Sequence, residues 1–222
     1  YYRDIRNLAG TATDPIVIRG TSARYGRLVN SDFGMVRGFI VRFDQRIGND
    51  FFAGVDYTFQ VARANASDPA QVYNAAAARQ QLEQQIVPTS WDQRHTANAS
   101  LNYTNARVNA GFGRVASYGS GQPYTPAVTT RVTGGTVPPT VIPLNSESRP
   151  SVFSLNLSAY KNFEVAGSEL QVFTRVDNVF DNRNEVDVFG DTGRATYSLE
   201  QGIEASSFIG NPSLLERRYI RP

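Results

Sequence analysis

The chain has 222 residues, of which 41% are hydrophobic, and a mean hydropathy of −0.35. No stretch approaches the roughly 18 consecutive apolar residues of a transmembrane helix, so a helical membrane protein is excluded. Cysteine is absent, which excludes disulfides and thiolate chemistry. The net charge of +2 comes from scattered arginines and a single lysine, which offer no basic cluster for nucleic acid.

The predicted elements are strands, recognised by alternation of apolar and polar residues. In residues 51–61 every odd position is apolar or aromatic, and from Gly54 onward the even positions are Gly, Asp, Thr and Gln. The full set of predicted strands is 1–8, 35–47, 51–61, 96–103, 108–112, 152–159 and 170–180.

Connections of two lengths alternate between these strands. Short ones are predicted at 48–50, 104–106 and 166–168, and long ones at 11–32, 65–91, 119–150 and 183–213. A two-faced strand occurs in a soluble sandwich, where the apolar face meets a second sheet, and in a membrane barrel, where it meets lipid. Short turns at one end, long loops at the other and strands of about ten residues favour the barrel.

The long connections differ in composition. Residues 121–143 are rich in proline and glycine and are predicted to be extended and exposed. Residues 75–85 are rich in Ala, Gln, Arg and Glu and predict a short helix. Aromatic residues lie toward strand ends, as in the girdles of membrane barrels, although ordinary β-propensity also accounts for Tyr57, Phe59, Tyr103, Tyr160, Phe163 and Phe180.

No catalytic, cofactor or metal site is predicted. His95 is the only histidine, and a triad of His95, Asp92 and a distant serine would lack any nucleophile-elbow motif, so His95 is interpreted as the start of a strand. The oxygen-rich run 177–187 lacks the spacing of a Ca²⁺-binding loop, and we interpret it as turn chemistry.

Five residues are candidates for ligand binding. Arg42 and Arg175 are predicted to face the lumen of the barrel, where guanidinium groups suit carboxylates or phosphates. Tyr118, Gln122 and Tyr124 are predicted in and around the third long loop, where aromatic side chains suit sugars.

Six short motifs follow one another along nearly the whole chain: 2–8 (YRDIRNL), 32–39 (DFGMVRGF), 57–62 (YTFQVA), 91–96 (WDQRHT), 119–126 (GSGQPYTP) and 176–181 (VDNVFD). In this order they resemble the C-terminal barrel region of TonB-dependent outer-membrane receptors, especially the type with an N-terminal carboxypeptidase-regulatory-like domain. The last motif resembles the N-L/V-F-D element that precedes the final loop in such receptors.

The resemblance implies an all-β fold, in which residues 1–222 are the C-terminal part of an antiparallel up-and-down barrel in the bacterial outer membrane. It implies a receptor, not an enzyme, that imports a scarce ligand with energy from the TonB complex. The implied partners are outer-membrane lipid and lipopolysaccharide, the rest of the barrel with its plug domain, the TonB complex through an N-terminal region, and an unknown small ligand. No nucleic acid and no cofactor are expected.

Further segments are expected outside this sequence. Residues 1–5 lack the charged and apolar regions of a signal peptide, so an exported protein would begin upstream. The resemblance places the plug, the first strands and a final strand ending in an aromatic residue beyond residues 1–222.

Two other classes of protein fit the same strands. One is a surface-structural or adhesive outer-membrane barrel that transports nothing. The other is a soluble extracellular β-sandwich or lectin-like module, which predicts a Greek-key strand order and a second sheet over the apolar face.

Overall fold

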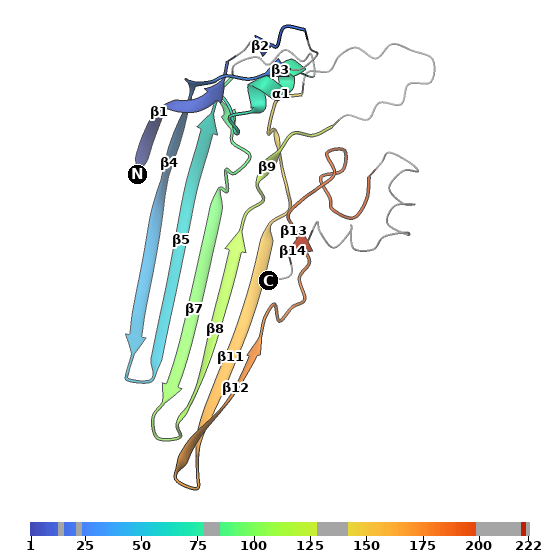
Figure 1. The fold of residues 1–222 in the computed structure, drawn as a ribbon. Coiled ribbons are helices and arrows are strands. Elements are labelled where there is room, and N and C mark those ends of the chain that lie inside the picture. Colours follow the sequence, from blue (N-terminus) through green and yellow to red (C-terminus); the bar gives the residue numbers. More distant parts are fainter. Residues whose placement is uncertain (13–15, 21–23, 78–84, 128–141, 199–218, 221–222) are drawn as a thin grey trace.

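A computed structural model describes residues 1–12, 16–20, 24–77, 85–127, 142–198 and 219–220. The fold is all-β and is dominated by one curved antiparallel sheet of long strands (Figure 1). The seven strands that follow one another in this sheet are β1 (Tyr2–Thr11), β4 (Leu28–Ile47), β5 (Phe51–Ala64), β7 (His95–Asn105), β8 (Ala110–Gly119), β11 (Val152–Val165) and β12 (Ser168–Val176).

The remaining elements are short and belong to the connections. They are β2 (Ile16–Val17), β3 (Arg24–Tyr25), α1 (Gln71–Ala77), β6 (Val87–Pro88), β9 (Pro123–Tyr124), β10 (Glu147–Ser148), β13 (Asn184–Glu185) and β14 (Tyr219–Ile220). Strand β6 pairs with the end of β5, and the other short strands form two-residue pairs with one another. Within the described residues, no helix is long and apolar enough to cross a bilayer.

The strand order is sequential, because each long strand pairs with the next long strand along the chain. A Greek-key order, which the sandwich alternative predicts, is not found in the described part of the chain. The sheet is open there: β1 and β12 each pair on one side only, so the described residues form no closed barrel.

The pairing register separates two faces. The side chains at odd positions of β4, β5, β7 and β11 and at even positions of β8 and β12 share one side, which we call the apolar face. One row across it joins Phe43, Val55, Ala99, Ala116 and Leu155. The expected alternation is therefore confirmed across these six strands.

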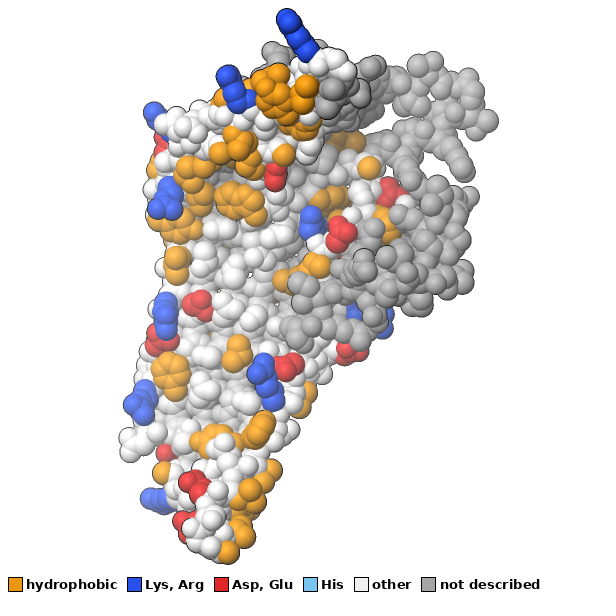
Figure 2. Space-filling view, viewed as in Figure 1, with side chains coloured by type: hydrophobic (Ala, Val, Ile, Leu, Met, Phe, Trp, Pro, Cys, Tyr) orange, Lys and Arg blue, Asp and Glu red, His pale blue; other side chains and the backbone are white. Residues whose placement is uncertain are grey.

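The opposite side, which we call the polar face, carries the other parity. One row across it joins Arg42, Asp56, Asn98, Ser117 and Ser154. The exceptions to its polarity include Ile40, Phe52, Val115 and Phe173. In the view of Figure 2, the middle of the sheet shows mostly backbone and uncharged polar side chains, and several basic groups lie next to acidic ones.

Several predicted boundaries are wrong. The strand predicted at 108–112 begins at Ala110 and runs to Gly119, and the strand predicted at 152–159 runs to Val165. The turn predicted at 104–106 lies at 106–109. The Asn105 side chain accepts hydrogen bonds from the backbone N–H groups of Arg107 and Val108 at 3.0 and 3.2 Å, and these bonds hold the turn after Asn105 rather than before it. The loop predicted at 11–32 is shorter, since β4 already begins at Leu28, opposite Thr11. The last long strand ends at Val176 rather than 180, because Asn178 adopts a left-handed φ of 50°.

The predicted helix begins earlier than expected. It spans Gln71–Ala77, because the Asp68 side chain accepts a hydrogen bond from the Ala70 N–H at 2.6 Å and so fixes the first turn. Of the predicted range 75–85, residues 78–84 lie outside the described residues.

A substitution at Gly38 tests how closely β4 and β5 approach each other. A Cβ at Gly38 would lie 2.0 Å from the backbone oxygen of Phe59, whereas a Cβ at Gly113, on the same face, would meet only the side-chain tips of Ser158 and Asn102 at 2.9 and 3.0 Å. We expect Gly38→Ala to lower the free energy of unfolding by about 1–3 kcal/mol, because backbone must move, and Gly113→Ala by less. Denaturant titration of both variants measures this; equal losses would contradict the close approach.

Candidate functional site

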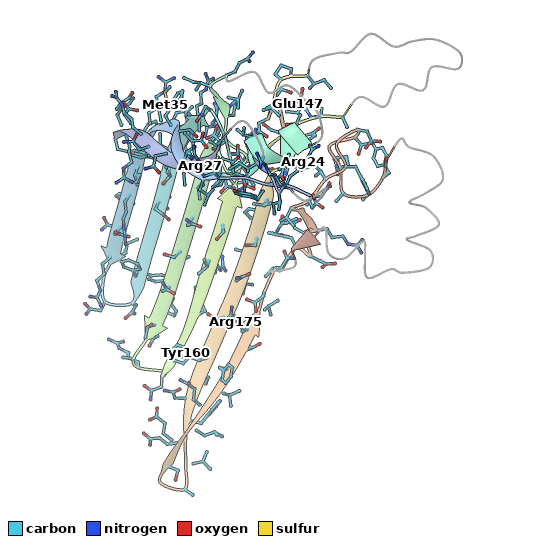
Figure 3. The ribbon with its side chains drawn as sticks, turned by 45° about the horizontal axis from the view of Figure 1, so that its top comes forward. Arg24, Arg27, Met35, Glu147, Tyr160 and Arg175 are labelled. Atoms are coloured by element: carbon cyan, nitrogen blue, oxygen red, sulfur yellow. The ribbon has the colours of Figure 1, made fainter. Side chains whose placement is uncertain are left out.

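The long connections gather at one end of the sheet and contact one another in sequence. Figure 3 shows side chains concentrated at this end, where Arg24, Arg27 and Glu147 lie, while Tyr160 and Arg175 lie on the strands. We call the described residues of the connections 12–27, 65–94, 120–151 and 177–198 the loop layer.

Tyr73 in α1 joins the first connection to the second. Its backbone N–H donates to Thr11 Oγ1 at 3.0 Å, and its hydroxyl donates to the Arg24 carbonyl, also at 3.0 Å. The Tyr73 ring also lies over Gly26, where an added Cβ would be 2.8 Å from it. Tyr73 thus fixes the helix of the second connection against the end of β1 and against the first connection.

Asp92 anchors the second connection to the sheet. Its side chain is fully buried; Oδ1 accepts the backbone N–H of Ala62 at 2.8 Å, and Oδ2 accepts Nε of Arg94 at 2.6 Å. The backbone N–H of Thr89 donates to the Ala62 carbonyl. A buried carboxylate is stable only with such partners, so Asp92 and Arg94 act together to cap the end of β5.

Asn145 joins the second connection to the third. Its side-chain amide donates to the Pro88 carbonyl at 2.7 Å and to Ser67 Oγ at 3.2 Å, and its φ of 54° is left-handed. Within the third connection, the backbone of Arg149 passes so close to Gly121 that an added Cβ would lie 1.5 Å from the Arg149 carbonyl oxygen. The glycine in the 119–126 motif is therefore required by this approach.

Tyr124 lies where the third connection meets the fourth. It pairs with Glu147 between β9 and β10, and its hydroxyl lies beside Gly193, 2.4 Å from where a Cβ would be. Burial raises the pKa of the Tyr124 phenol, and the negative charges of Glu147 and Asp191 raise it further. Both effects favour the neutral phenol, whose hydroxyl lies beside Gly193.

Asparagine side chains complete the upper edge of β11, where β12 has already left the sheet. Both the N–H and the carbonyl of Phe153 bond to the side-chain amide of Asn184, at 2.9 and 3.0 Å. Asn182 reaches the same carbonyl at 3.3 Å, and the N–H of Asn178 donates to Asn156 Oδ1 at 2.9 Å. These amides replace a neighbouring strand. The predicted local turn chemistry of the run 177–187 is found where the Asn178 side chain bonds the backbone carbonyl and N–H of Asn182, whereas the bonds to Phe153 are long-range and were not predicted.

The five predicted binding residues do not form one cluster. Gln122 and Tyr124 lie in the loop layer, where the Gln122 carbonyl accepts the Arg149 N–H at 2.9 Å. Tyr118 was expected beside a loop but belongs to β8 and lies on the apolar face, opposite Phe153.

Arg42 and Arg175 lie on the polar face, as predicted, but on strands near opposite edges of the sheet. Each forms an ion pair two residues along its own strand, Arg42 with Asp44 at 2.7 Å and Arg175 with Asp177 at 2.9 Å. Both guanidinium groups remain largely exposed. They can therefore exchange their carboxylate partners for an anionic ligand at small cost.

The residues of the rejected triad have other partners. Asp92 bonds Ala62 and Arg94, and Nδ1 of His95 lies 2.7 Å from the Tyr57 hydroxyl. Ser120 Oγ accepts the backbone N–H of His95, not its ring. Among the described residues, no group of three or more acidic or histidine side chains is placed to hold a metal ion.

Sequence reasoning missed a cavity of about 480 Å³ beside the upper parts of β1 and β4. Its charged lining residues are Asp4, Arg6, Asp32 and Arg63, and the Asp32 carboxylate accepts the side-chain amide of Asn65 at 3.0 Å. The volume lies in the range of small-molecule sites. Residues of the two motifs 2–8 and 32–39 line it, but neither motif was predicted to form a site.

No protein-family model matches the chain, and no curated protein is similar to it in sequence. Function is therefore inferred from the register of the sheet, the chemistry of its two faces and the loop layer.

Asp92→Ala should loosen the second connection. The variant leaves the buried Ala62 N–H without an acceptor, so we expect a loss of about 2–3 kcal/mol in the free energy of unfolding and faster proteolysis within 65–94. Asp92→Asn keeps the acceptor oxygen and should lose less. Unchanged proteolysis of the alanine variant would show that Asp92 does not anchor the connection.

Proposed function

We propose that this chain forms part of the wall of a bacterial outer-membrane β-barrel, and that the barrel is a TonB-dependent receptor importing a scarce ligand. One observation carries the membrane part of the proposal: a continuous apolar face runs in register across six strands and has no described layer over it. Phe39, Phe43 and Val172 on this face are 51, 59 and 54% exposed. A surface of this extent requires an apolar partner, and lipid supplies one.

Aromatic side chains on the apolar face form two rows. The row at the turn end includes Phe51, Tyr103 and Phe112, whose ring centroids are 4.5 and 5.4 Å apart in succession. The row at the loop end includes Phe39 and Phe59, 5.6 Å apart. Phe51 and Phe59 are separated by roughly 26 Å along β5, which supports a lipid-facing band framed by two interfaces.

The stagger of the hairpins supports a tilted wall. Phe51 pairs with Tyr103, two residues before β7 ends, and Ala110 pairs with Lys161, four residues before β11 ends. Together these two offsets shift the strands by about 20 Å along their own direction. From the first hairpin to the third there are four strand spacings, about 19 Å in all. If the turns lie at one height in the membrane, the strands are therefore tilted by about 45°. Membrane barrels tilt their strands by roughly 35–45°.

The receptor part of the proposal is supported by the motif series, the polar face and the loop layer. The long connections at one end, linked through Tyr73, Asn145 and Arg149, provide a surface for ligand capture. Arg42 and Arg175 line the polar face, which would be the lumen side, with ion pairs that an anionic ligand can displace.

Fractionation of the full-length protein tests the proposal. We expect recovery in outer membranes, resistance to extraction by urea, and co-purification with the periplasmic domain of TonB. Recovery solely as a soluble monomer would exclude the membrane wall. Membrane recovery without TonB binding would favour the adhesive barrel instead.

Single cysteines on β7 distinguish the two faces, since the chain has none of its own. In the membrane, we expect Asn98→Cys on the polar face to react with a charged maleimide several-fold faster than Ala99→Cys on the apolar face, because lipid excludes the reagent from Ala99. Labelling after denaturation is the control for reactivity. Equal rates in the folded protein would argue against lipid on the apolar face.

A further inference from the structure

We propose that a cavity on the polar face binds an organic cation with an apolar body, and that Asp32 is its counter-charge. The cavity has a volume of about 320 Å³ and lies between the sheet and the second connection, at the loop end of β1, β4 and β5 (Figure 1). In the proposed barrel this place is the extracellular mouth of the lumen. The inference rests on the proposed receptor but goes beyond it, because it names the chemistry of the ligand.

The walls of this cavity are apolar, although they belong to the polar face of the sheet. The register places Ile5 and Ala64 on that face, each opposite Gly34. Nearer the turns, the same face carries polar side chains such as Asp56 and Asn98. A hydrated lumen wall does not require an apolar cavity, whereas a site for a small ligand is mostly apolar with a few polar groups.

Trp91 forms the wall that the second connection contributes, together with Ala66 and Pro69. It is the only tryptophan of the chain and is 47% exposed, although Asp92 beside it is fully buried. Because Asp92 accepts the Ala62 N–H, the backbone next to Trp91 is tied to β5. A large ring held half exposed at a cavity can pack against an apolar group, and its face attracts a cation.

The charge at the cavity is the carboxylate of Asp32, a residue that is only 5% exposed. Its Oδ1 accepts hydrogen bonds from Ser31 Oγ at 3.2 Å and from Asn65 Nδ2 at 3.0 Å. Gly10 leaves space beside Oδ2, since a Cβ there would lie 2.4 Å from this oxygen. Within the described residues, no hydrogen bond reaches Oδ2 and no cation lies within ion-pair distance. A buried carboxylate with neutral partners alone is costly, so a cationic ligand is favoured.

The other charged residues at the cavity do not neutralise Asp32. Asp68 adds a second carboxylate, whose Oδ1 accepts the Ala70 N–H at 2.6 Å. Arg63 also borders the cavity, but it pairs with Met35 in the register, so its side chain projects from the apolar face on the other side of the sheet. The space on the polar face is therefore both apolar and negatively charged, which selects a cation with an apolar body over an anion.

This site is separate from the arginines of the polar face. Arg42 lies ten residues from Asp32 along β4, roughly 33 Å at the rise of a strand. A small ligand held at Asp32 does not reach Arg42, so the cavity is a contact of its own at the entrance.

Calorimetric titration of the purified full-length protein in detergent tests the site with three matched probes, phenylbutylammonium, phenylbutanol and phenylbutyrate. The probes share an apolar body and differ in charge. We expect the ammonium to bind about tenfold more tightly than the carboxylate, because only the ammonium can pair with Asp32. Titration of each probe into detergent alone corrects for partition into micelles.

Asp32→Asn keeps the shape of the side chain and an oxygen for Ser31 and Asn65. It should weaken binding of the ammonium by about tenfold and leave binding of the alcohol unchanged, which shows that the cavity is intact. Trp91→Leu should weaken all three probes by about threefold, because the ring contacts their shared body. Asp50→Asn removes the same charge in a short turn at the far end of the sheet and should change nothing.

Equal affinity of the wild type for the ammonium and the carboxylate would overturn the cation site while leaving the receptor intact. An unchanged affinity of Asp32→Asn for the ammonium, or a parallel loss of the alcohol, would do the same, because Asp32 would then act on the structure and not on the charge. Recovery of the protein solely as a soluble monomer would instead exclude the receptor, and the titration would still decide whether the cavity binds a cation.

Discussion

The backbone pairing of β5 with β4 and β7 is the constraint on which the other features depend. Because side chains alternate with a period of two, a slip of one residue in this register would move Phe43, Val55 and Ala99 to the opposite side of the sheet. The close approach of Gly38 to the Phe59 backbone and the buried Asp92 at the end of β5 both hold this register. The apolar face of these three strands and the offset between the first two hairpins follow from it.

The loop layer is held by a different kind of interaction. Its fixed points include single polar side chains that bond distant backbone, such as Tyr73, Asn145 and Asn184. Such bonds position a loop beside the few apolar residues buried in it, Val87, Phe189 and Ala195. A surface built in this manner can vary its tips while the frame beneath it stays constant, which suits recognition of an external ligand.

The strands and their faces could be predicted from the sequence, because alternation is local and each strand carries its own evidence. The hydrogen bonds of the Asn105 side chain, which place the turn between β7 and β8 later than predicted, are also local. Only the structure shows which backbone N–H groups donate to this side chain. The roles of Asp92 and Asn184 could not be predicted, since their partners Ala62 and Phe153 are some thirty residues away. Tyr118 was misplaced for a related reason: its strand was predicted to end too early, so the parity of residue 118 was lost.

The stagger of the hairpins also bears on the width of the proposed barrel. At a tilt near 45°, each strand occupies about 7 Å of perimeter rather than the roughly 4.8 Å of a vertical strand. The seven consecutive strands would then span an arc of roughly 48 Å. In the proposed barrel, the step between hairpins and the number of strands that complete the circle together fix the bore through which cargo would pass.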